Sequence, residues 1–485
     1  MTERKAPWAW VGVALIVLVT RLTEMGVSLD PALFASIARN IVRSRDIWSL
    51  YAGENFFPQF YEHPFFAIWM QALVFKFLGA SEVTSRLVGL MFGAGTFYYL
   101  YRLAQRLVDA RFANVFCFVS LLSIYFVGRM PTFYFEVPLT FFLFGSFYYF
   151  WKSLLLPDRK DEVLSGIFLG LAFLTKGLAS LPVVALMGVS TLYHYKKDFW
   201  KVRAFWVVMG ITTAIVFLFC FTQNRFGSYP FWSLYWNRHH VESGAAERVF
   251  EIQFLIAFLK KFWQTHALHI LIALLGCGFF IFKDEVRTSC KDALFVGLLG
   301  SFLFLLANGS IGLTHLHYFY TIYPVANIVT AVGLYPIALK FPEKNWLRWG
   351  LAIAIGYLLI WQVLPVSMRR KADLDYYQLK GAVEALKGSG VKSLEGLGIE
   401  ETEWDIREVS LWYWDIEIFL RATPTDVKGS AVLVRYKNET RSLEDELIKK
   451  KYQFCAGSPK FSLYVNSESL EAACKHAKME AKYLR

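Results

Sequence analysis

Long apolar runs alternate with short charged segments from the start of the chain to about residue 366. A helix that crosses a bilayer needs about 20 mostly apolar residues, and each of these runs approaches that length. They lie near residues 8–25, 84–105, 112–128, 133–153, 163–178, 179–195, 204–222, 266–282, 291–308, 317–339 and 347–366. The pattern predicts an all-α polytopic membrane protein with about 11 transmembrane helices.

The connecting segments predict the orientation of these helices. Cytoplasmic loops of membrane proteins carry an excess of Lys and Arg, and the alternate short loops of this chain are basic. These loops contain residues 102–111, 152–160, 196–203, 283–291 and 340–348. We therefore expect a cytoplasmic N-terminus, with long loops 26–83 and 223–265 and the C-terminal tail on the extracytoplasmic side.

Segments outside the spans show patterns of their own. Asp30 and Pro31 favour the start of a helix over 31–43, and the run 63–78 predicts a helix at the membrane interface. Residues 367–485 mix helical and β-rich patterns, which predicts a small soluble α/β domain after a membrane domain of residues 1–366. Its helices are expected at 376–387, 442–451 and 468–483, and its strands at 430–436 and 461–465.

Composition supports this division and excludes an ordinary soluble enzyme. Of all residues, 56% are hydrophobic and 19% are charged, against about 25% charged in a typical soluble domain. Residues 1–366 hold 31 Lys and Arg and 20 Asp and Glu, whereas residues 367–485 hold 20 and 19. The net positive charge therefore lies in the membrane domain, where it indicates topology and contact with membrane lipids, and no nucleic acid is expected as a partner.

The C-terminal tail contains two cysteines, Cys455 and Cys474. In an oxidising compartment they are candidates for a disulfide. Sequence alone leaves the pairing open, because it does not give the geometry that a disulfide requires.

Ionisable and aromatic residues gather at the predicted outer ends of the spans. Such groups are costly at a membrane, so they are candidates for function. Their placement on several helix ends predicts a polar cavity with an active site at the outer face. The residues are Asp30, Glu62, His63, Arg129, Glu136, Lys176, His315, His317 and Tyr318.

Stretches of the chain resemble motifs of the membrane glycosyltransferases of the GT-C fold. The resemblance is closest to bacterial members related to protein O-mannosyltransferases and to the aminoarabinose transferase of lipid A. The stretches cover most of residues 20–340 in the family's order. They read SLDPALFASIARNI, YEHPFFAIWMQALVFKFLGASEVTSRLVGLMFG, GRMPTFYFEVPLTFFLFGSFYYF, GLAFLTKGLASLPVVAL and HLHYFYTIYP.

The resemblance implies an integral membrane glycosyltransferase that uses a sugar linked through phosphate to a polyprenyl lipid. The sugar, a hexose or a pentose, passes with inversion to a hydroxyl of a lipid, glycan or protein at the outer face of the membrane. The reaction needs no cofactor, and a divalent metal is allowed but not required. The bacterial relatives imply a bacterial inner membrane, with the C-terminal domain in the periplasm.

The resemblance also assigns roles to single residues. Asp30 is the base, a role in which a carboxylate takes the proton of the acceptor hydroxyl. Lys176, in the motif TKG, stabilises the charge of the departing phosphate, and Glu136 orients Lys176 or another phosphate-binding group. Further candidates for the phosphate are Arg129, His63 and Arg238 with its neighbours His239 and His240, and candidates for acceptor or donor contacts are Glu62, His317 and Tyr318.

This chain departs from the family pattern at two positions. Many relatives have Lys-Pro-Pro where this chain has His63-Pro64-Phe65. A histidine is charged only in part near neutral pH, which weakens the case for phosphate contact at His63. Pro31 follows Asp30 where relatives often have a second acidic residue, so one ligand or acid is missing.

Structural roles compete with these functional ones. Asp30 before a proline suits a helix N-cap, and Lys176 suits a lysine that extends to the membrane interface. His315, His317 and Tyr318 suit a hydrogen-bonded interface patch. Glu62 and His63 are adjacent and lack the spacing of metal ligands, so no metal site is predicted.

Two other functions compete with glycosyl transfer. A polytopic transporter or lipid flippase would place charges along a path across the whole membrane, whereas the inner halves of these spans carry few charges. A catalytically inactive scaffold is the other alternative, and Asp30, Glu136 and Lys176 together argue against it. The sequence leaves open the identity of the sugar and whether the acceptor is lipid A, another glycolipid, a polymer or a protein.

Overall fold

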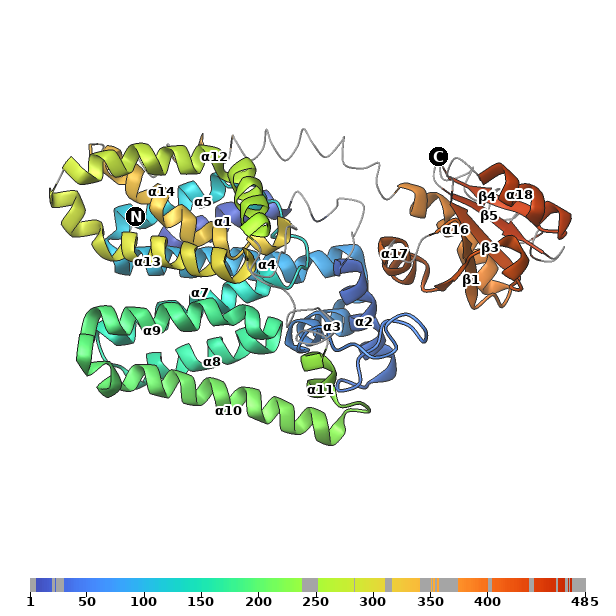
Figure 1. Ribbon diagram of the computed structural model, residues 1–485, viewed down its shortest axis with the longest axis horizontal. Coiled ribbons are helices and arrows are strands. Elements are labelled where there is room, and N and C mark those ends of the chain that lie inside the picture. The colour runs from blue at the N-terminus through green and yellow to red at the C-terminus, as the bar shows by residue number, and fades with distance from the viewer. Residues whose placement is uncertain are drawn as a thin grey trace. The chain divides into compact units, whose positions relative to one another are not determined.

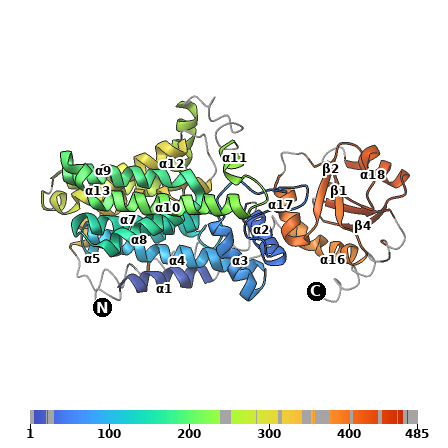
Figure 2. The same ribbon diagram turned by 90° about the horizontal axis from the view of Figure 1, so that it is seen from below.

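The computed structural model describes residues 6–19, 22, 30–237, 252–282, 284–309, 316–340, 350, 352–353, 356, 374–399, 404–435, 440–458, 461–466, 470 and 472. The chain divides into two compact units (Figures 1 and 2). The first unit comprises Met1–Thr23, Tyr61–Val74 and Val83–Pro365, and the second comprises Glu24–Phe60, Phe75–Glu82 and Val366–Arg485. The second unit therefore joins the C-terminal tail to two pieces of the first long loop.

The described part of the first unit is helical. Helices occur at the positions of the predicted spans up to residue 339, whereas most of the span predicted at 347–366 lies outside the described residues. The helices are α1 (Ala6–Val19), α4 (Glu82–Leu107), α5 (Ala110–Leu122), α6 (Ile124–Val127), α7 (Glu136–Leu155), α8 (Arg159–Lys176), α9 (Leu181–Tyr195), α10 (Arg203–Phe226), α11 (Phe231–Trp236), α12 (Ile252–Phe282), α13 (Asp284–Gly309) and α14 (Ile322–Ala338), with short 3-10 turns η1 (Gly177–Ser180), η2 (Lys196–Lys201) and η4 (Leu316–Phe319). Helix α3 (Phe66–Leu78) follows the segment expected at the interface.

The boundaries of the second long loop differ from those predicted. The apolar run begins near residue 266, but α12 begins at Ile252, and α11 lies before it. Lys260 and Lys261 interrupt the apolar pattern without interrupting the helix, because lysine is itself a good helix former. The loop expected over 223–265 is therefore partly helical.

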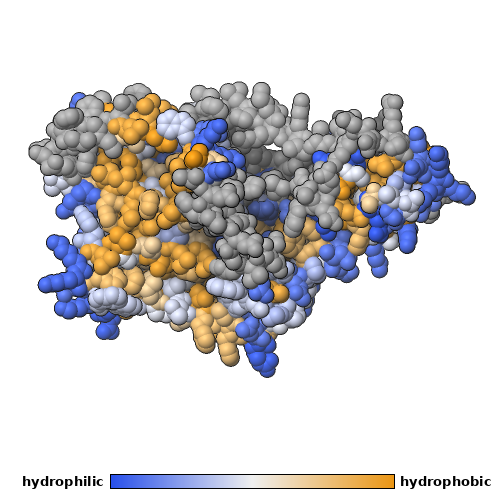
Figure 3. All heavy atoms as spheres, in the orientation of Figure 1, coloured by the Kyte–Doolittle hydropathy of each residue, from blue (hydrophilic) through white to orange (hydrophobic). Residues whose placement is uncertain are grey.

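Among the described residues, three helical stretches are long and apolar enough to cross a membrane: Arg159–Lys201, Arg203–Phe226 and Thr288–Asn308. Phe217 and Phe221 of α10 are exposed to 69% and 60%, which suits a helix face in contact with lipid. Figure 3 shows apolar side chains over the described helices of this unit. The predicted total of about 11 spans and their orientation stay predictions.

Small residues allow α7, α8 and α10 to pack closely. Ser146 and Ser165 each donate a hydrogen bond to the other's carbonyl, at 2.8 and 2.9 Å, and so join α7 to α8. A Cβ atom on Gly166 would lie 2.7 Å from the Cβ atom of Ile211 on α10. Small residues and hydroxyls at helix contacts are typical of packing within membranes.

Ion pairs join the same helices at the end opposite Glu136 and Lys176. Lys152 of α7 pairs with Asp161 of α8 at 2.6 Å, and Arg203 of α10 pairs with Glu162 of α8 at 2.9 Å. The α7 segment 137–151 and the α8 segment 163–175 contain no Asp, Glu, Lys or Arg. The charges on these two helices are thus confined to their ends.

The second unit contains an α/β fold with a five-stranded mixed sheet in the order β2-β1-β3-β5-β4. Strands β1 (Ser393–Leu397), β2 (Glu417–Arg421) and β3 (Ala431–Arg435) are parallel, and β5 (Phe461–Val465) is antiparallel to β3 and β4 (Gln453–Gly457). Helices α16 (Leu374–Gly388), α17 (Trp404–Trp414) and α18 (Thr440–Lys449) pack against the sheet (Figure 2). Cys455 in β4 is disulfide-bonded, and Cys474 lies outside the described residues.

The part of the first long loop that belongs to this unit forms helix α2 (Asp30–Ser44) and a compact turn over residues 50–60. The helix predicted over 31–43 is therefore present, and it begins at Asp30 itself. A carboxylate in the first turn is stabilised by the helix dipole.

We expect Gly166→Ala to destabilise the helix bundle by about 1–3 kcal/mol, because the added methyl overpacks the contact with Ile211. Gly210→Ala is the matched control, since nothing lies within 4 Å of the added atom and alanine favours a helix by about 1 kcal/mol. Thermal unfolding of the purified proteins in detergent should show a lower midpoint for Gly166→Ala and an unchanged or higher one for Gly210→Ala. Equal midpoints would contradict the close packing of α8 on α10.

Candidate active site

Three elements of the first unit bring an acidic, a basic and an aromatic side chain together. The carboxylate of Glu136, the first residue of α7, accepts a hydrogen bond from the ammonium of Lys176, the last residue of α8. Their side chains are only 4% and 10% exposed. The Lys176 Nζ atom also lies 4.6 Å from the ring centroid of Tyr318 in η4, within the range of a cation–π contact. The lysine charge is thus held by two partners in a largely buried place.

The turn after Lys176 fixes the position of the lysine. Gly177 has φ +56°, a left-handed conformation that favours glycine. A Cβ atom there would lie 2.1 Å from the hydroxyl oxygen of Tyr235 in α11. Tyr235 is 4% exposed, and its hydroxyl is hydrogen-bonded to the backbone of Leu178. Helix α8 therefore ends at the glycine of the motif TKG, and Tyr235 of the second long loop packs against this turn.

The segment before Glu136 carries two further candidates. The Arg129 guanidinium carbon lies 5.1 Å from the ring centroid of Tyr134. The ring of His63 packs edge-on against Phe135, with 5.1 Å between centroids. Arg129 and His63 thus contact a single short segment that leads directly into Glu136.

The other predicted residues are placed as follows. Asp30 is partly buried at the start of α2 in the second unit, and Glu62 is partly buried before α3. His317 lies in η4, but its side chain is outside the described part of the structure, as are Arg238, His239, His240 and His315. Within the described residues, no group of three or more His, Cys, Asp or Glu side chains forms a potential metal site.

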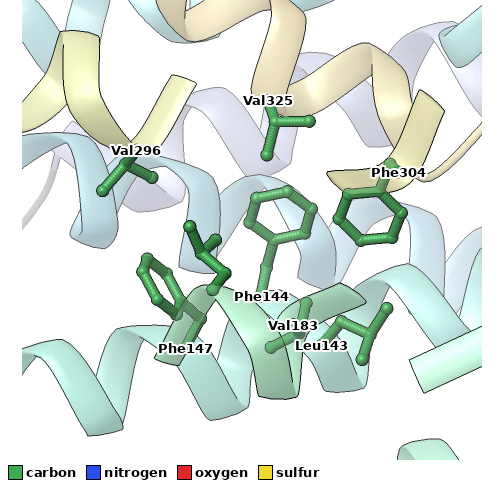
Figure 4. A pocket seen from close by; sticks show the side chains of 8 residues that line it. Leu143, Phe144, Phe147, Val183, Val296, Phe304 and Val325 are labelled. Atoms are coloured by element: carbon green, nitrogen blue, oxygen red, sulfur yellow. The ribbon is translucent and has the colours of Figure 1, made fainter. Parts of the chain in front are cut away.

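A small apolar cavity, with room for about one water-sized sphere, lies between α7, α9, α13 and α14. Side chains of α7, α9, α13 and α14 point toward one another around it (Figure 4). Leu143 follows Glu136 by two helical turns, or about 10 Å at 1.5 Å per residue, while Val183 and Val325 lie in the first turns of α9 and α14. The lining residues are Leu143, Phe144, Phe147, Val183, Leu186, Val296, Phe304 and Val325. Helix α7 thus carries both Glu136 of the charged cluster and residues that line this cavity.

The Glu136–Lys176–Tyr318 cluster suits the binding of an anion. A lysine ammonium has three N–H donors, and the hydrogen bond to Glu136 uses one of them. Cations that are already oriented stabilise a developing phosphate charge without further reorganisation. The cluster is therefore chemically suited to hold a lipid phosphate.

The chain is similar to known proteins in both sequence and structure. Residues 62–222 match the family described as dolichyl-phosphate-mannose-protein mannosyltransferase. The crystal structure of ArnT from Cupriavidus metallidurans bound to undecaprenyl phosphate matches with a TM-score of 0.66 and 15% identity, covering 95% of this chain and 98% of that chain. The oligosaccharyltransferase of Archaeoglobus fulgidus matches with a TM-score of 0.52 and 14% identity, covering 95% and 73%. The two structural similarities extend over nearly the whole chain, whereas the family match is confined to residues 62–222.

The chain has the GT-C fold. This confirms the resemblance seen in the sequence. A protein of Aquifex aeolicus (strain VF5), described as uncharacterized, is 26% identical over 350 residues, which cover 70% of this chain and 63% of that relative. The match thus spans less than two thirds of the relative's length.

The matched family region of this GT-C protein contains His63, Arg129, Glu136 and Lys176 and leaves out Asp30 and Tyr318. The sequence predicts both members of the ion pair and includes Tyr318 among the contacts. It does not indicate Tyr235, because the second long loop shows no periodic pattern that would point a tyrosine at the turn after Lys176. The functional roles of all these residues stay predictions.

We expect Glu136→Gln to destabilise the protein by about 3–5 kcal/mol, because it leaves the buried Lys176 charge without its counterion. Adding Lys176→Met to Glu136→Gln should restore most of this loss, since the charge is then removed. Asp198→Asn, in an exposed pair with Lys201, serves as the control and should change little. Unfolding in detergent measures these proteins together with the single variant Lys176→Met, and a loss in the double variant equal to the sum of the two single losses would show that the two residues are not coupled.

Proposed function

We propose that the protein is an inverting glycosyltransferase that moves a sugar from a polyprenyl-phosphate donor to an acceptor hydroxyl at the outer face of a bacterial inner membrane. The observation that carries this proposal is the cluster in which Glu136 and Tyr318 hold the largely buried ammonium of Lys176. The GT-C fold supports it, and so does the similarity to ArnT, whose crystal structure contains undecaprenyl phosphate. The chemistry of the site and the ligand of this relative both support the proposed donor class.

In this proposal Lys176 contacts the donor phosphate, and Glu136 positions the lysine. The polyprenyl tail packs against the apolar helices of the first unit that are long enough to cross a membrane. Burial of apolar surface contributes about 25 cal/mol per Å², so the lipid tail supplies much of the binding energy. Arg129 is the additional cation that we expect near the phosphate.

Asp30 is the base of the proposed reaction. Its carboxylate accepts the proton of the acceptor hydroxyl, and the hydroxyl oxygen forms a bond to the anomeric carbon from the face opposite the phosphate. The bond between the anomeric carbon and the phosphate oxygen breaks, and polyprenyl phosphate leaves with the electron pair. Attack from the opposite face inverts the anomeric configuration. Neither a cofactor nor a metal is needed for these steps.

The location of the second unit follows from the same proposal. The basic alternate loops predict that the tail lies outside the cytoplasm, and disulfides persist in oxidising compartments such as the periplasm. The disulfide of Cys455 supports this placement. The acceptor is then a lipid, a glycan or a protein that is reached from the periplasmic side.

Transport is the less favoured function. A transporter places polar groups near the middle of the membrane, whereas α7 and α8 carry their charges only at their ends. These observations favour a site at one face of the membrane.

We expect Asp30→Asn to lower sugar transfer by about 100-fold to 10,000-fold, because general base catalysis contributes that much. Purified protein is incubated with membranes of the source cell, and mass spectrometry measures free polyprenyl phosphate and the mass gained by the acceptor. Asp46→Asn is the matched control in the same loop, because its oxygen accepts hydrogen bonds from the backbone of Trp48 and Ser49 and asparagine can do the same. Undiminished release by folded Asp30→Asn would remove Asp30 from the mechanism.

We expect Lys176→Ala to lower transfer by about 100-fold or more, because it removes the cation at the leaving phosphate. Lys201→Ala, at a residue whose side chain is 82% exposed, should keep normal transfer. Binding of polyprenyl phosphate to detergent-solubilised protein provides a second measurement, and we expect it to weaken in Lys176→Ala. Unchanged donor binding and turnover would refute the phosphate role.

A further inference from the structure

Helix α2 is held at its C-terminal half by the helix that precedes β2. The Arg39 guanidinium donates hydrogen bonds to the carbonyl oxygens of Leu411 and Trp412, at 2.6 and 3.0 Å. It also lies 2.8 Å from the Asp415 carboxylate, and Arg43 pairs with the same carboxylate at 2.8 Å. All these residues belong to the second unit. One end of α17 thus binds two successive turns of α2.

The turn over residues 50–60, which follows α2, is bound by Glu417, two residues after Asp415. The Glu417 carboxylate accepts hydrogen bonds from the backbone N–H groups of Asn55 and Phe56, at 2.9 and 3.2 Å, and from the Asn55 side chain at 3.0 Å. A Cβ atom on Gly53 would lie 2.0 Å from a Glu417 oxygen, so only glycine allows this approach. The Arg407 guanidinium carbon lies 4.2 Å from the ring centroid of Phe56.

The positive charges around Asp415 keep its carboxyl group ionised. Burial alone would raise the pKa of its carboxyl, but the hydrogen bond from Arg43 and the charges of Arg39, Arg43 and Lys387 outweigh burial and lower the pKa below its usual value of 3.8. A group with a lowered pKa contributes its stabilisation above the unfolded value and loses it as the pH falls through the folded value. The charge that holds α2 is therefore fully present near neutral pH.

Helix α2 connects Asp30 to the residues that make these contacts. Arg39 and Arg43 follow Asp30 by nine and thirteen residues, which place them about 14 and 20 Å along the axis. At 100° per residue they lie on the side of α2 roughly opposite Asp30. The contacts with α17 therefore hold the C-terminal end of α2, on the side of the helix roughly opposite Asp30.

We propose that Asp415 and Glu417 are positioning residues that hold α2 and its following turn, and thereby fix the carboxylate of Asp30 for proton abstraction. The inference rests on the proposed function, in which Asp30 is the base. It gives the C-terminal domain a role in the catalytic step: a helix anchored at both its end and its exit turn keeps its first residue in one place. A misplacement of about 1 Å at a reacting group lowers rates by about 100-fold.

The test compares the full-length protein with two variants in which uncharged side chains replace charged ones. The first is the double variant Asp415→Asn and Glu417→Gln, and the second is the single variant Arg43→Gln. Hydrogen–deuterium exchange of the peptides over residues 30–60 reports the attachment, and transfer assays report kcat and the KM for the donor. We expect faster exchange in 30–60 in both variants. In the double variant we expect kcat to fall about 100-fold with an unchanged donor KM. Arg43→Gln should lower kcat less, because the side chain is 54% exposed and Arg39 still binds α17.

Asp426→Asn is the control within the same domain. Its carboxylate accepts hydrogen bonds from the backbone N–H and the hydroxyl of Thr423. The hydrogen–deuterium exchange of residues 30–60 and kcat should both stay at the wild-type level. Unchanged exchange in both test variants would overturn the attachment. Faster exchange with an unchanged kcat would overturn the positioning role. Full activity of Asp30→Asn would instead overturn the base on which the inference rests, and the exchange data would still decide the attachment separately.

Discussion

The buried pair of Glu136 and Lys176 is the constraint around which the first unit is organised. An unpaired charge in an apolar helix bundle costs several kcal/mol, so the start of α7 and the end of α8 must lie together wherever these two residues are buried. The left-handed turn at Gly177 and the closure by Tyr235 then fix the end of α8. The interaction that sets the contact between two helix ends is also the one that holds a largely buried cation at the end of α8.

The sequence predicts the helices well and the contacts between them poorly. Span positions depend on the length and hydropathy of each run, which are local properties, and helices occur at nearly all predicted positions. The start of α12 was predicted too late because Lys260 and Lys261 interrupt the apolar run without ending the helix. The Glu136–Lys176 contact was within reach, because both residues lie at the same predicted face, whereas the contact of Tyr235 with Gly177 depends on the path of a long loop.

The attachment of α2 to the C-terminal domain shows the same limit more strongly. Its pairs join residues more than 360 positions apart, and no motif marks Asp415 or Glu417 in the sequence. The pattern over 31–43 indicates a helix but not its partner. Such contacts form only after both elements have folded, so local propensity carries no information about them.

The ion pairs of the first unit differ in exposure, and the difference separates structural from functional charge. Arg203 is 52% exposed beside Glu162, and Lys152 is 28% exposed beside Asp161, so each cation remains in contact with its surroundings at a helix end. The side chains of Glu136 and Lys176 are only 4% and 10% exposed, and a buried ion pair is often no more stable than apolar residues of the same volume. Stability alone therefore gives no reason for charges at this place. The proposed function gives one, because an oriented cation stabilises the charge of a phosphate that leaves.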